Sequence, residues 1–327
     1  MLSRVADAIY WMNRYLERVE NYARFLDVNF NLSLEFKKSQ EQWMPLVLTT
    51  GDWDIFEELN YQTNKTQVIY FLAFDEKNEN SIYNSIVKAR ENARSVRPEI
   101  TKEVWEEINK LYYLVKEGVS TKVWEQKDPR SFFVQVKKSC QLLYGIFDST
   151  ISRVDSWHFG KIGQLIERAD KTSRVLDVKY HMLLPSPQTV GTPYDLIQWA
   201  ALLKSVSAYD MYRRKYGKLT PISISEFLIL DTAFPRSILK CISSVELSLH
   251  NITGKSNSYS NRAEKEIGKL KAYLEFSDIK EIFSLGLHEY IETIQVNLNV
   301  ISNAIFDTFF SIENVGVTNN SNQSQIQ

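Results

Sequence analysis

The sequence predicts an all-α protein, a helical bundle built from two related halves. Apolar residues recur at the i, i+3, i+4, i+7 spacing of amphipathic helices, and no convincing series of strands accompanies them. The 11 glycines and 8 prolines are few for 327 residues, which favours long helices. The segment YLERVENYARFLDV at 15–28 returns as LIERADKTSRVLDV at 165–178, with six of fourteen positions identical and no gap.

The first half is expected to hold one long helix and several shorter ones. Apolar spacing predicts a helix over 5–30, followed by a second one to about Phe36. The PLVLTT segment at 45–50, with Gly51 after it, is expected to be a break. Ser81 is the expected N-cap of a helix that Pro98 ends, and Asp128-Pro129 is expected to start another. The helix that starts at Asp128-Pro129 is expected to run to about Ile146, and further helices are predicted over 53–59, 66–74 and 99–116.

The second half is expected to repeat this plan. A long helix over 152–181 carries the repeated segment, and Pro185, Pro187 and Pro193 mark a linker after it. Residues 194–216 are predicted to form a helix that Gly217 ends. The remaining predictions are a turn at Pro221, a helix start framed by Asp231 and Pro235, a helix over 261–274, a final helix from Ser277 or Asp278 to about Ile312, and a disordered tail over 313–327.

Length, charge and cysteine usage narrow the class of protein. We predict a single helical domain over 1–312, with repeat halves at about 1–147 and 151–312. The net charge of −1 provides no global attraction to nucleic acid or anionic lipid. Cys140 and Cys241 are the only cysteines, and no run of eighteen apolar residues occurs. These features favour a cytoplasmic protein that binds neither nucleic acid nor membrane.

The repeated segment places two Glu-Arg dipeptides, Glu17-Arg18 and Glu167-Arg168, at the edge of an apolar helix face. Adjacent residues lie about 100° apart on a helix, so neither dipeptide can pair with itself. Each charge therefore needs a partner on another helix, a ligand or water. One interpretation is a reciprocal network in which Glu17 meets Arg168 and Glu167 meets Arg18. Another is a ligand site, because arginine presents a fork suited to carboxylate or phosphate. Plain surface exposure is the third.

Other polar residues of the two segments join the candidate site. Glu20 with Arg24, and Asp170 with Arg174, have the i, i+4 spacing and acid-first order that stabilise a helix locally. The remaining candidates of the two segments are Asn21, Asp27 and Asp177. Arg236 follows Pro235 at a helix start, where the backbone amides could bind an anion or serve in capping.

Common cofactor motifs are absent from the sequence. Neither GxxxxGK[ST] nor GxGxxG occurs, and HExxH is also missing. His288 and Glu292 lie one helical turn apart, as do Glu246 and His250, but either pair supplies only two of the three or four ligands that a metal site needs. We therefore expect no cofactor and no metal.

Four segments of the chain together resemble the bacterial alpha-E domain family, which is named for its helices and Glu-Arg motifs. They are 1–28, RENARSVRPEIT at 90–101, 157–184 and FLILDTAFPRSILKCI at 227–242. The resemblance implies an all-helical fold whose family motifs correspond to Glu17-Arg18 and Glu167-Arg168. It also implies partners: genes of that family commonly neighbour those of an ATP-grasp-type amide ligase and a transglutaminase-like peptidase.

Three functions follow from these observations. The first is an auxiliary or substrate-binding component of a ligase-associated system for peptide or amide synthesis, or for peptide modification, in which the Glu-Arg helices bind an anionic group or partner. The second is an enzyme with Glu17 or Glu167 as general base and Arg18 or Arg168 as anion clamp. The third is a helical scaffold whose charges are purely structural.

Overall fold

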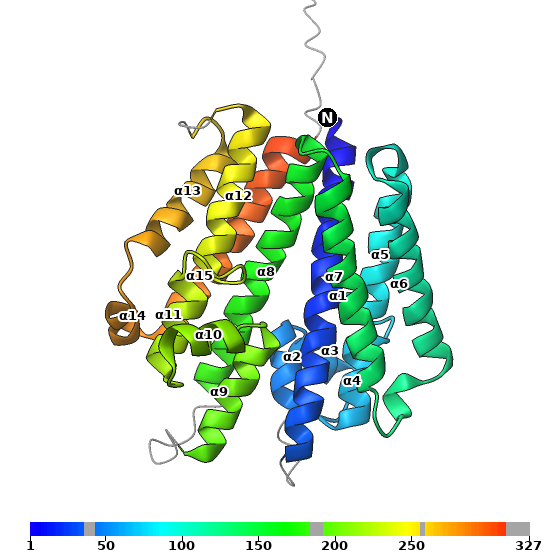
Figure 1. Cartoon of the computed structure of the whole chain (residues 1–327), viewed down its shortest axis with the longest axis vertical. Helices are drawn as coiled ribbons and strands as arrows, with labels where there is room; N and C mark the ends of the chain where they lie inside the picture. The colour runs from blue at the N-terminus through cyan, green and yellow to red at the C-terminus, as the bar shows by residue number, and fades with distance from the viewer. Residues whose placement is uncertain (36–42, 183–191, 256–258, 312–327) are drawn as a thin grey trace, which may run out of the picture.

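The computed structural model describes residues 1–35, 43–182, 192–255 and 259–311, and every regular element in these ranges is a helix. The first half is a bundle of four long helices (Figure 1). Its members are α1 (Ser3–Glu35), α5 (Ile82–Ser95), α6 (Lys102–Ser120) and α7 (Arg130–Thr150). Helix α1 packs on α5 and α7, and α6 closes the bundle by packing on both.

The second half contains four long helices that pack in the same way. They are α8 (Asp155–Met182), α12 (Ile238–Thr253), α13 (Arg262–Glu275) and α15 (Leu287–Ile305). Helix α8 packs on α12 and α15, while α13 packs on both of those. The two bundles meet where α1 lies along α8. The all-α prediction is therefore confirmed, while the duplication itself stays a prediction.

Shorter helices connect the long ones and gather towards one end of the molecule (Figure 1). In the first half these are α2 (Met44–Thr50), α3 (Trp53–Glu58) and α4 (Lys65–Ala73). In the second half they are α9 (Pro193–Ser205), α10 (Tyr209–Tyr216), α11 (Pro221–Leu230) and α14 (Ile279–Leu285). Two 3₁₀ turns, Arg97–Glu99 and Val123–Glu125, and a π-helical turn, Phe306–Phe310, complete the set.

The contact between α1 and α8 depends on a glycine. A Cβ atom added to Gly163 would lie 2.2 Å from the carbonyl oxygen of Tyr10, closer than any side chain allows. The two helix backbones therefore touch at this point, and the apolar side chains of Val19, Leu26 and Ile166 pack fully buried along the same helices. Close approach also brings the two Glu-Arg segments within reach of each other.

A second pair of similar segments positions the helices on either side of the α1–α8 pair. Residues 71–82 and 227–238 both read FLxxDxxxxxSI, at a shift of 156. In both, the serine caps the next helix: Ser81 accepts a bond from the amide of Asn84, and Ser237 from that of Lys240. Asn80 and Arg236 consequently occupy equivalent places, each one residue before a capping serine.

Several predicted boundaries in the first half are wrong, and proline and glycine explain the clearest error. Helix α1 runs unbroken to Glu35 instead of ending near Phe30. The segment 45–50 is helix α2, because a proline fits the first turn of a helix and Gly51, with φ of 81°, ends it. By contrast, the cap at Ser81 is confirmed. Before α7, Pro129 occupies the N-cap position and the Asp128 carboxylate accepts a bond from the Arg130 amide.

The second half differs from prediction for similar reasons. Pro193 and Pro221 begin helices α9 and α11, each behind a capping threonine. The helix expected over 194–216 is two helices, separated where Ser207 adopts a left-handed φ of 54°. Gly217 ends α10 as predicted. Asp278 caps only the short α14, because Gly286, with φ of 113°, separates it from α15.

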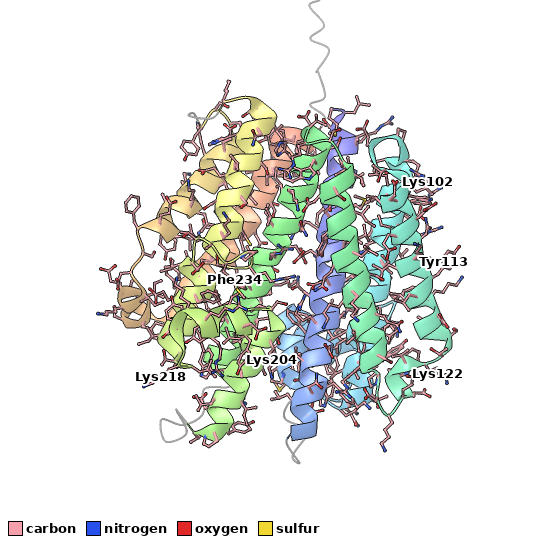
Figure 2. All side chains as sticks on the ribbon, viewed as in Figure 1. Lys102, Tyr113, Lys122, Lys204, Lys218 and Phe234 are labelled. Carbon is pink, nitrogen blue, oxygen red and sulfur yellow. The ribbon has the colours of Figure 1, made fainter. Side chains whose placement is uncertain are left out.

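Side chains fill the space between helices, and polar ones project from the outer surface, as Lys102, Tyr113 and Lys122 do (Figure 2). Within the described ranges, none of the helices combines the length and apolar character that crossing a bilayer requires. The predicted tail at 313–327, and Pro185 and Pro187 of the predicted linker, lie outside the described residues.

Candidate functional site: a buried charge network between α1 and α8

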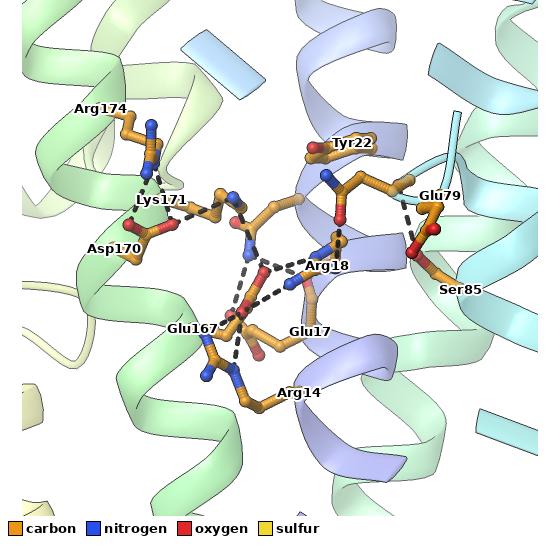
Figure 3. A network of polar contacts seen from close by, with 12 residues as sticks. Arg14, Glu17, Arg18, Tyr22, Glu79, Ser85, Glu167, Asp170, Lys171 and Arg174 are labelled. Atoms are coloured by element: carbon orange, nitrogen blue, oxygen red, sulfur yellow. Dashed lines mark hydrogen bonds and ion pairs between the residues drawn. The ribbon is translucent and has the colours of Figure 1, made fainter. Parts of the chain in front are cut away.

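The two Glu-Arg dipeptides pair reciprocally across the α1–α8 contact, which is one of the three interpretations that the sequence left open. Arg168 donates from Nε and Nη2 to the two carboxylate oxygens of Glu17, both at 2.9 Å. Arg18 donates in the same bidentate way to Glu167, at 2.7 and 3.2 Å. Both glutamates are completely buried. Figure 3 shows Arg18 reaching from α1 to Glu167 on α8.

Residues at equivalent positions add a second layer of contacts to each glutamate. Three residues before the glutamates, Arg14 donates to Glu167 at 3.0 Å and Gln164 donates to Glu17 at 3.3 Å. Four residues after them, Asn21 donates to Glu17, and the ammonium of Lys171 lies 3.7 Å from Glu167. The contacts therefore follow a two-fold pattern even where the residue types differ.

The acidic residues one turn further along make the predicted i, i+4 pairs. Arg174 donates to both oxygens of Asp170, at 3.0 and 3.1 Å, and Arg24 forms an ion pair with Glu20. Lys171 also bonds Asp170 at 3.0 Å. These pairs are more than local helix stabilisation, because Glu20 is completely buried and Arg24 is 6% exposed.

Arg236 joins the network through its side chain, which the sequence analysis missed. Its guanidinium donates to Glu17 at 3.1 Å, to Asn21 at 3.0 Å and to Glu20 at 2.7 Å. The N-cap of α12 is Ser237, the residue after Arg236. The equivalent residue in the first half, Asn80, accepts a bond from Arg18 at 2.5 Å and donates to the buried Asp52.

Positive charge exceeds negative charge in this network. Among the described residues, seven cations surround four carboxylates through ion pairs. The cations are Arg14, Arg18, Arg24, Arg168, Lys171, Arg174 and Arg236, and the carboxylates are Glu17, Glu20, Glu167 and Asp170. A formal surplus of three positive charges therefore lies between the two bundles.

A family model matches residues 1–310, and its domain is described as a predicted alpha-helical domain with a conserved ER motif. The chain belongs to the Alpha-E family. Its two Glu-Arg dipeptides are those at 17–18 and 167–168. In this Alpha-E domain the dipeptides thus form a single structure, in which each acid is bound by the arginine of the other copy.

Relatives of this Alpha-E chain include proteins of Mycobacterium bovis and of two strains of Mycobacterium tuberculosis, all three named as uncharacterized. Each is 22% identical over 313 residues, which cover 87% of this chain and 34% of the relative. The chain therefore spans about a third of the length of the curated relatives it matches. No solved structure is significantly similar to it.

Electrostatics favour the ionised form of both glutamates in the Alpha-E network. Burial alone would raise the pKa of Glu17, but Arg168 and Arg236 outweigh it and lower the pKa to about 2. Burial opposes ionisation of Glu167 as well, yet Arg18, Lys171 and Arg14 hold its pKa well below the ordinary value. For Arg24 the environment instead disfavours the charged form, because burial and repulsion from Arg236 lower the pKa of its guanidinium. A general base needs access to substrate and a pKa near the working pH, so this environment disfavours catalysis by Glu17 or Glu167.

The last two sequence candidates lie outside the network. Asp27 pairs with Lys137 on α7 at 3.0 Å. Asp177 lies 2.6 Å from His288 on α15, a contact that raises the pKa of the imidazole against the effect of burial. Both pairs join neighbouring helices of one bundle. Nowhere in the described ranges do three His, Cys, Asp or Glu side chains group as a metal site would require.

Proposed function

We propose that this chain is a non-catalytic helical component of a system for peptide or amide synthesis, or for peptide modification, and that it acts beside an ATP-grasp-type amide ligase. The observation that carries the proposal is the length of its relatives. The matched region is 34% of each mycobacterial protein, so an Alpha-E unit there is joined to about twice its own length of other sequence. A helical unit attached to other sequence in relatives fits an auxiliary role.

In this proposal the Glu-Arg helices hold the two bundles in fixed positions and present positive charge to an anionic group. The reciprocal pairs account for the placement of the four Glu-Arg charges, and the surplus cations account for the anion preference. A cytoplasmic location is part of the proposal, since the two cysteines are free and buried, as a reducing compartment permits.

An exposed apolar patch on α13 and α14 is the proposed docking surface for the ligase. Phe276 is 88% exposed and Leu285 is 77% exposed, and both border a hollow that Tyr273 and Tyr290 also line. Side chains of this kind stay in contact with water at a free-energy cost, and clusters of them mark protein interaction sites. We call Tyr273, Phe276 and Leu285 the α13–α14 patch.

The test is binding to the ligase encoded in the same genome. Purified chain should bind the purified ligase in a calorimetric titration, and Phe276→Ser with Leu285→Ser should weaken the affinity at least about ten-fold. Leu247→Ser is the control, because Leu247 is also exposed but belongs to α12 and does not line the hollow. Absence of a complex, or equal binding by the patch variant, contradicts the proposal. Binding to a transglutaminase-like protein instead would move the partner assignment to that protein.

A purely structural scaffold is the second candidate, and one observation favours it. All four charges of the two Glu-Arg dipeptides are bound to each other, so none of them lacks a partner. The two candidates differ in what the surplus cations do, because a scaffold has no need of an anion.

A further inference from the structure

A hollow of about 410 Å³ lies beside the charge network, between α1 and the end of α15. Its walls are aromatic and amide side chains, and Arg14 reaches it from the network. It is lined by Trp11, Arg14, Asn299, Ser302, Asn303 and Phe306, and we call it the Arg14 hollow. Its size falls in the range of pockets that bind small molecules.

Arg14 connects the hollow to the buried glutamates. Its Nε donates to Glu167 at 3.0 Å, while its Nη1 donates to two uncharged groups, the Tyr10 hydroxyl at 3.2 Å and the Ser302 hydroxyl at 3.5 Å. Hydroxyl groups are weaker partners for a guanidinium than a carboxylate is. A negatively charged oxygen in the hollow would therefore bind Nη1 better than its present partners do.

The aromatic rings around Arg14 shape the rest of the hollow. The guanidinium carbon lies 4.9 Å from the centre of the Trp11 ring, and Phe306 is 50% exposed on the opposite helix. Phe306 begins a π-helical turn, a rare conformation that recurs at functional sites. The amides of Asn299 and Asn303, on the exposed face of α15, offer donors and acceptors at the rim.

We propose that the Arg14 hollow binds the carboxylate end of an amino acid or peptide that carries an aromatic or large apolar side chain. The carboxylate would bind Nη1 of Arg14, and the side chain would lie between Trp11 and Phe306. The surplus of positive charge in the network supports a negative ligand, since seven cations there face four carboxylates in the described residues. Arg14 is the single cation in the lining, which suits one carboxylate better than a phosphate of higher charge.

This inference rests on the proposed function for its substrate class, because a peptide- or amide-forming system handles carboxylates. The carboxylate-binding proposal and the proposed function can fail separately. Ligand binding is measured on the chain alone, whereas the proposed function is tested by complex formation with the ligase.

The experiment is a calorimetric titration of the full chain with N-acetyl-L-phenylalanine, N-acetyl-L-phenylalanine amide and inorganic phosphate. The acid should bind, and the amide, which lacks the charge, should bind at least about ten-fold more weakly. Phosphate should neither bind nor compete at equal concentration. Equal binding of acid and amide, no binding of the acid at millimolar concentration, or tighter binding of phosphate overturns the proposal.

Two single variants test whether the acid binds in the Arg14 hollow. Phe306→Ser should weaken binding of the acid at least about five-fold, because it removes one wall of the hollow. Val296→Ser is the control, since Val296 is 56% exposed on α15 but does not line the hollow. Unchanged affinity in Phe306→Ser overturns the assignment. Should that variant fail to fold, the comparison of acid with amide on the unaltered chain still decides the question.

Discussion

Glu17 and Arg18 are neighbours in the chain, yet each is bound by a residue of the other bundle. Helix geometry excludes pairing within each dipeptide, because adjacent side chains point about 100° apart, and the repeated segment makes the reciprocal pairing one of the possible outcomes. Arg236 could not be found in this way, since it lies outside the repeated segments at 15–28 and 165–178. A signal for it does exist: the repeated FLxxDxxxxxSI pattern places Arg236 where the first half has Asn80.

Two arginines of the network should differ sharply in their effect on stability. Arg168→Met leaves Glu17 buried without its bidentate partner, so the free energy of unfolding should fall by about 3–5 kcal/mol. Arg24→Met should cost less, about 1–2 kcal/mol, because burial and Arg236 already oppose its charge and Glu20 keeps its bond from Arg236. Urea unfolding at pH 7 measures both. Equal losses would contradict the different roles assigned to the two side chains.

The buried carboxylates make stability depend on pH in a defined direction. The pKa of Glu17 is about 2 in the folded chain against 4.5 ordinarily, so its contribution is complete above pH 4.5 and is lost as pH falls towards 2. The loss is of the order of 3 kcal/mol. Urea midpoints between pH 7 and pH 2 should fall more steeply for the unaltered chain than for Glu17→Gln. Glu106→Gln, at an exposed position on α6, should keep the steep dependence.

Helix boundaries show what periodicity and local signals can predict at the scale of single elements. The long helices follow from apolar spacing, because their buried faces repeat every three or four residues. The predicted break at 45–50 and the predicted turn at Pro221 are both wrong, because each proline stands in the first turn of a helix, α2 or α11. The break at Ser207 depends on a left-handed backbone conformation at that residue, which no local sequence pattern predicts.

Close approach of α1 to α8 is the element-scale feature that the network requires. Gly163→Ala places a methyl group against the Tyr10 carbonyl, so it should separate the helices and destabilise the fold by at least about 1–3 kcal/mol. Gly145→Ala is the matched control, because no atom lies within 4 Å of the added Cβ on α7. That change should be neutral or stabilising by up to about 1 kcal/mol. If denaturant midpoints fall equally in the two variants, close packing at Gly163 is not the reason.

At the scale of the whole molecule, the two bundles share one buried polar interface. Among the described residues, separating them would break the ion pairs that cross between the halves: Arg14 and Arg18 with Glu167, Arg168 and Arg236 with Glu17, and Arg236 with Glu20. The repeated segments at 15–28 and 165–178 predicted that this centre would exist. Helices α5 and α7 pack on α1 as α12 and α15 pack on α8. This correspondence could not be predicted, because it depends on contacts between helices and not on local sequence signals.

The shared interface should make the chain unfold as a single unit. We expect one transition in differential scanning calorimetry, with calorimetric and van't Hoff enthalpies that agree. Arg18→Met and Arg168→Met together should lower the transition temperature without splitting the transition. Two separate transitions in the unaltered chain would mean that each bundle is stable without the other.

The reciprocal pairing of the two Glu-Arg dipeptides is the central claim, and a set of double-mutant cycles tests it most directly. Unfolding free energies would be measured for Glu17→Gln, Glu167→Gln, Arg18→Met, Arg168→Met and their pairwise combinations. The structure predicts coupling of about 1–3 kcal/mol between Glu17 and Arg168 and between Glu167 and Arg18, with coupling near zero between the neighbours Glu17 and Arg18. Strong coupling within a dipeptide, with none across the helices, would contradict the account.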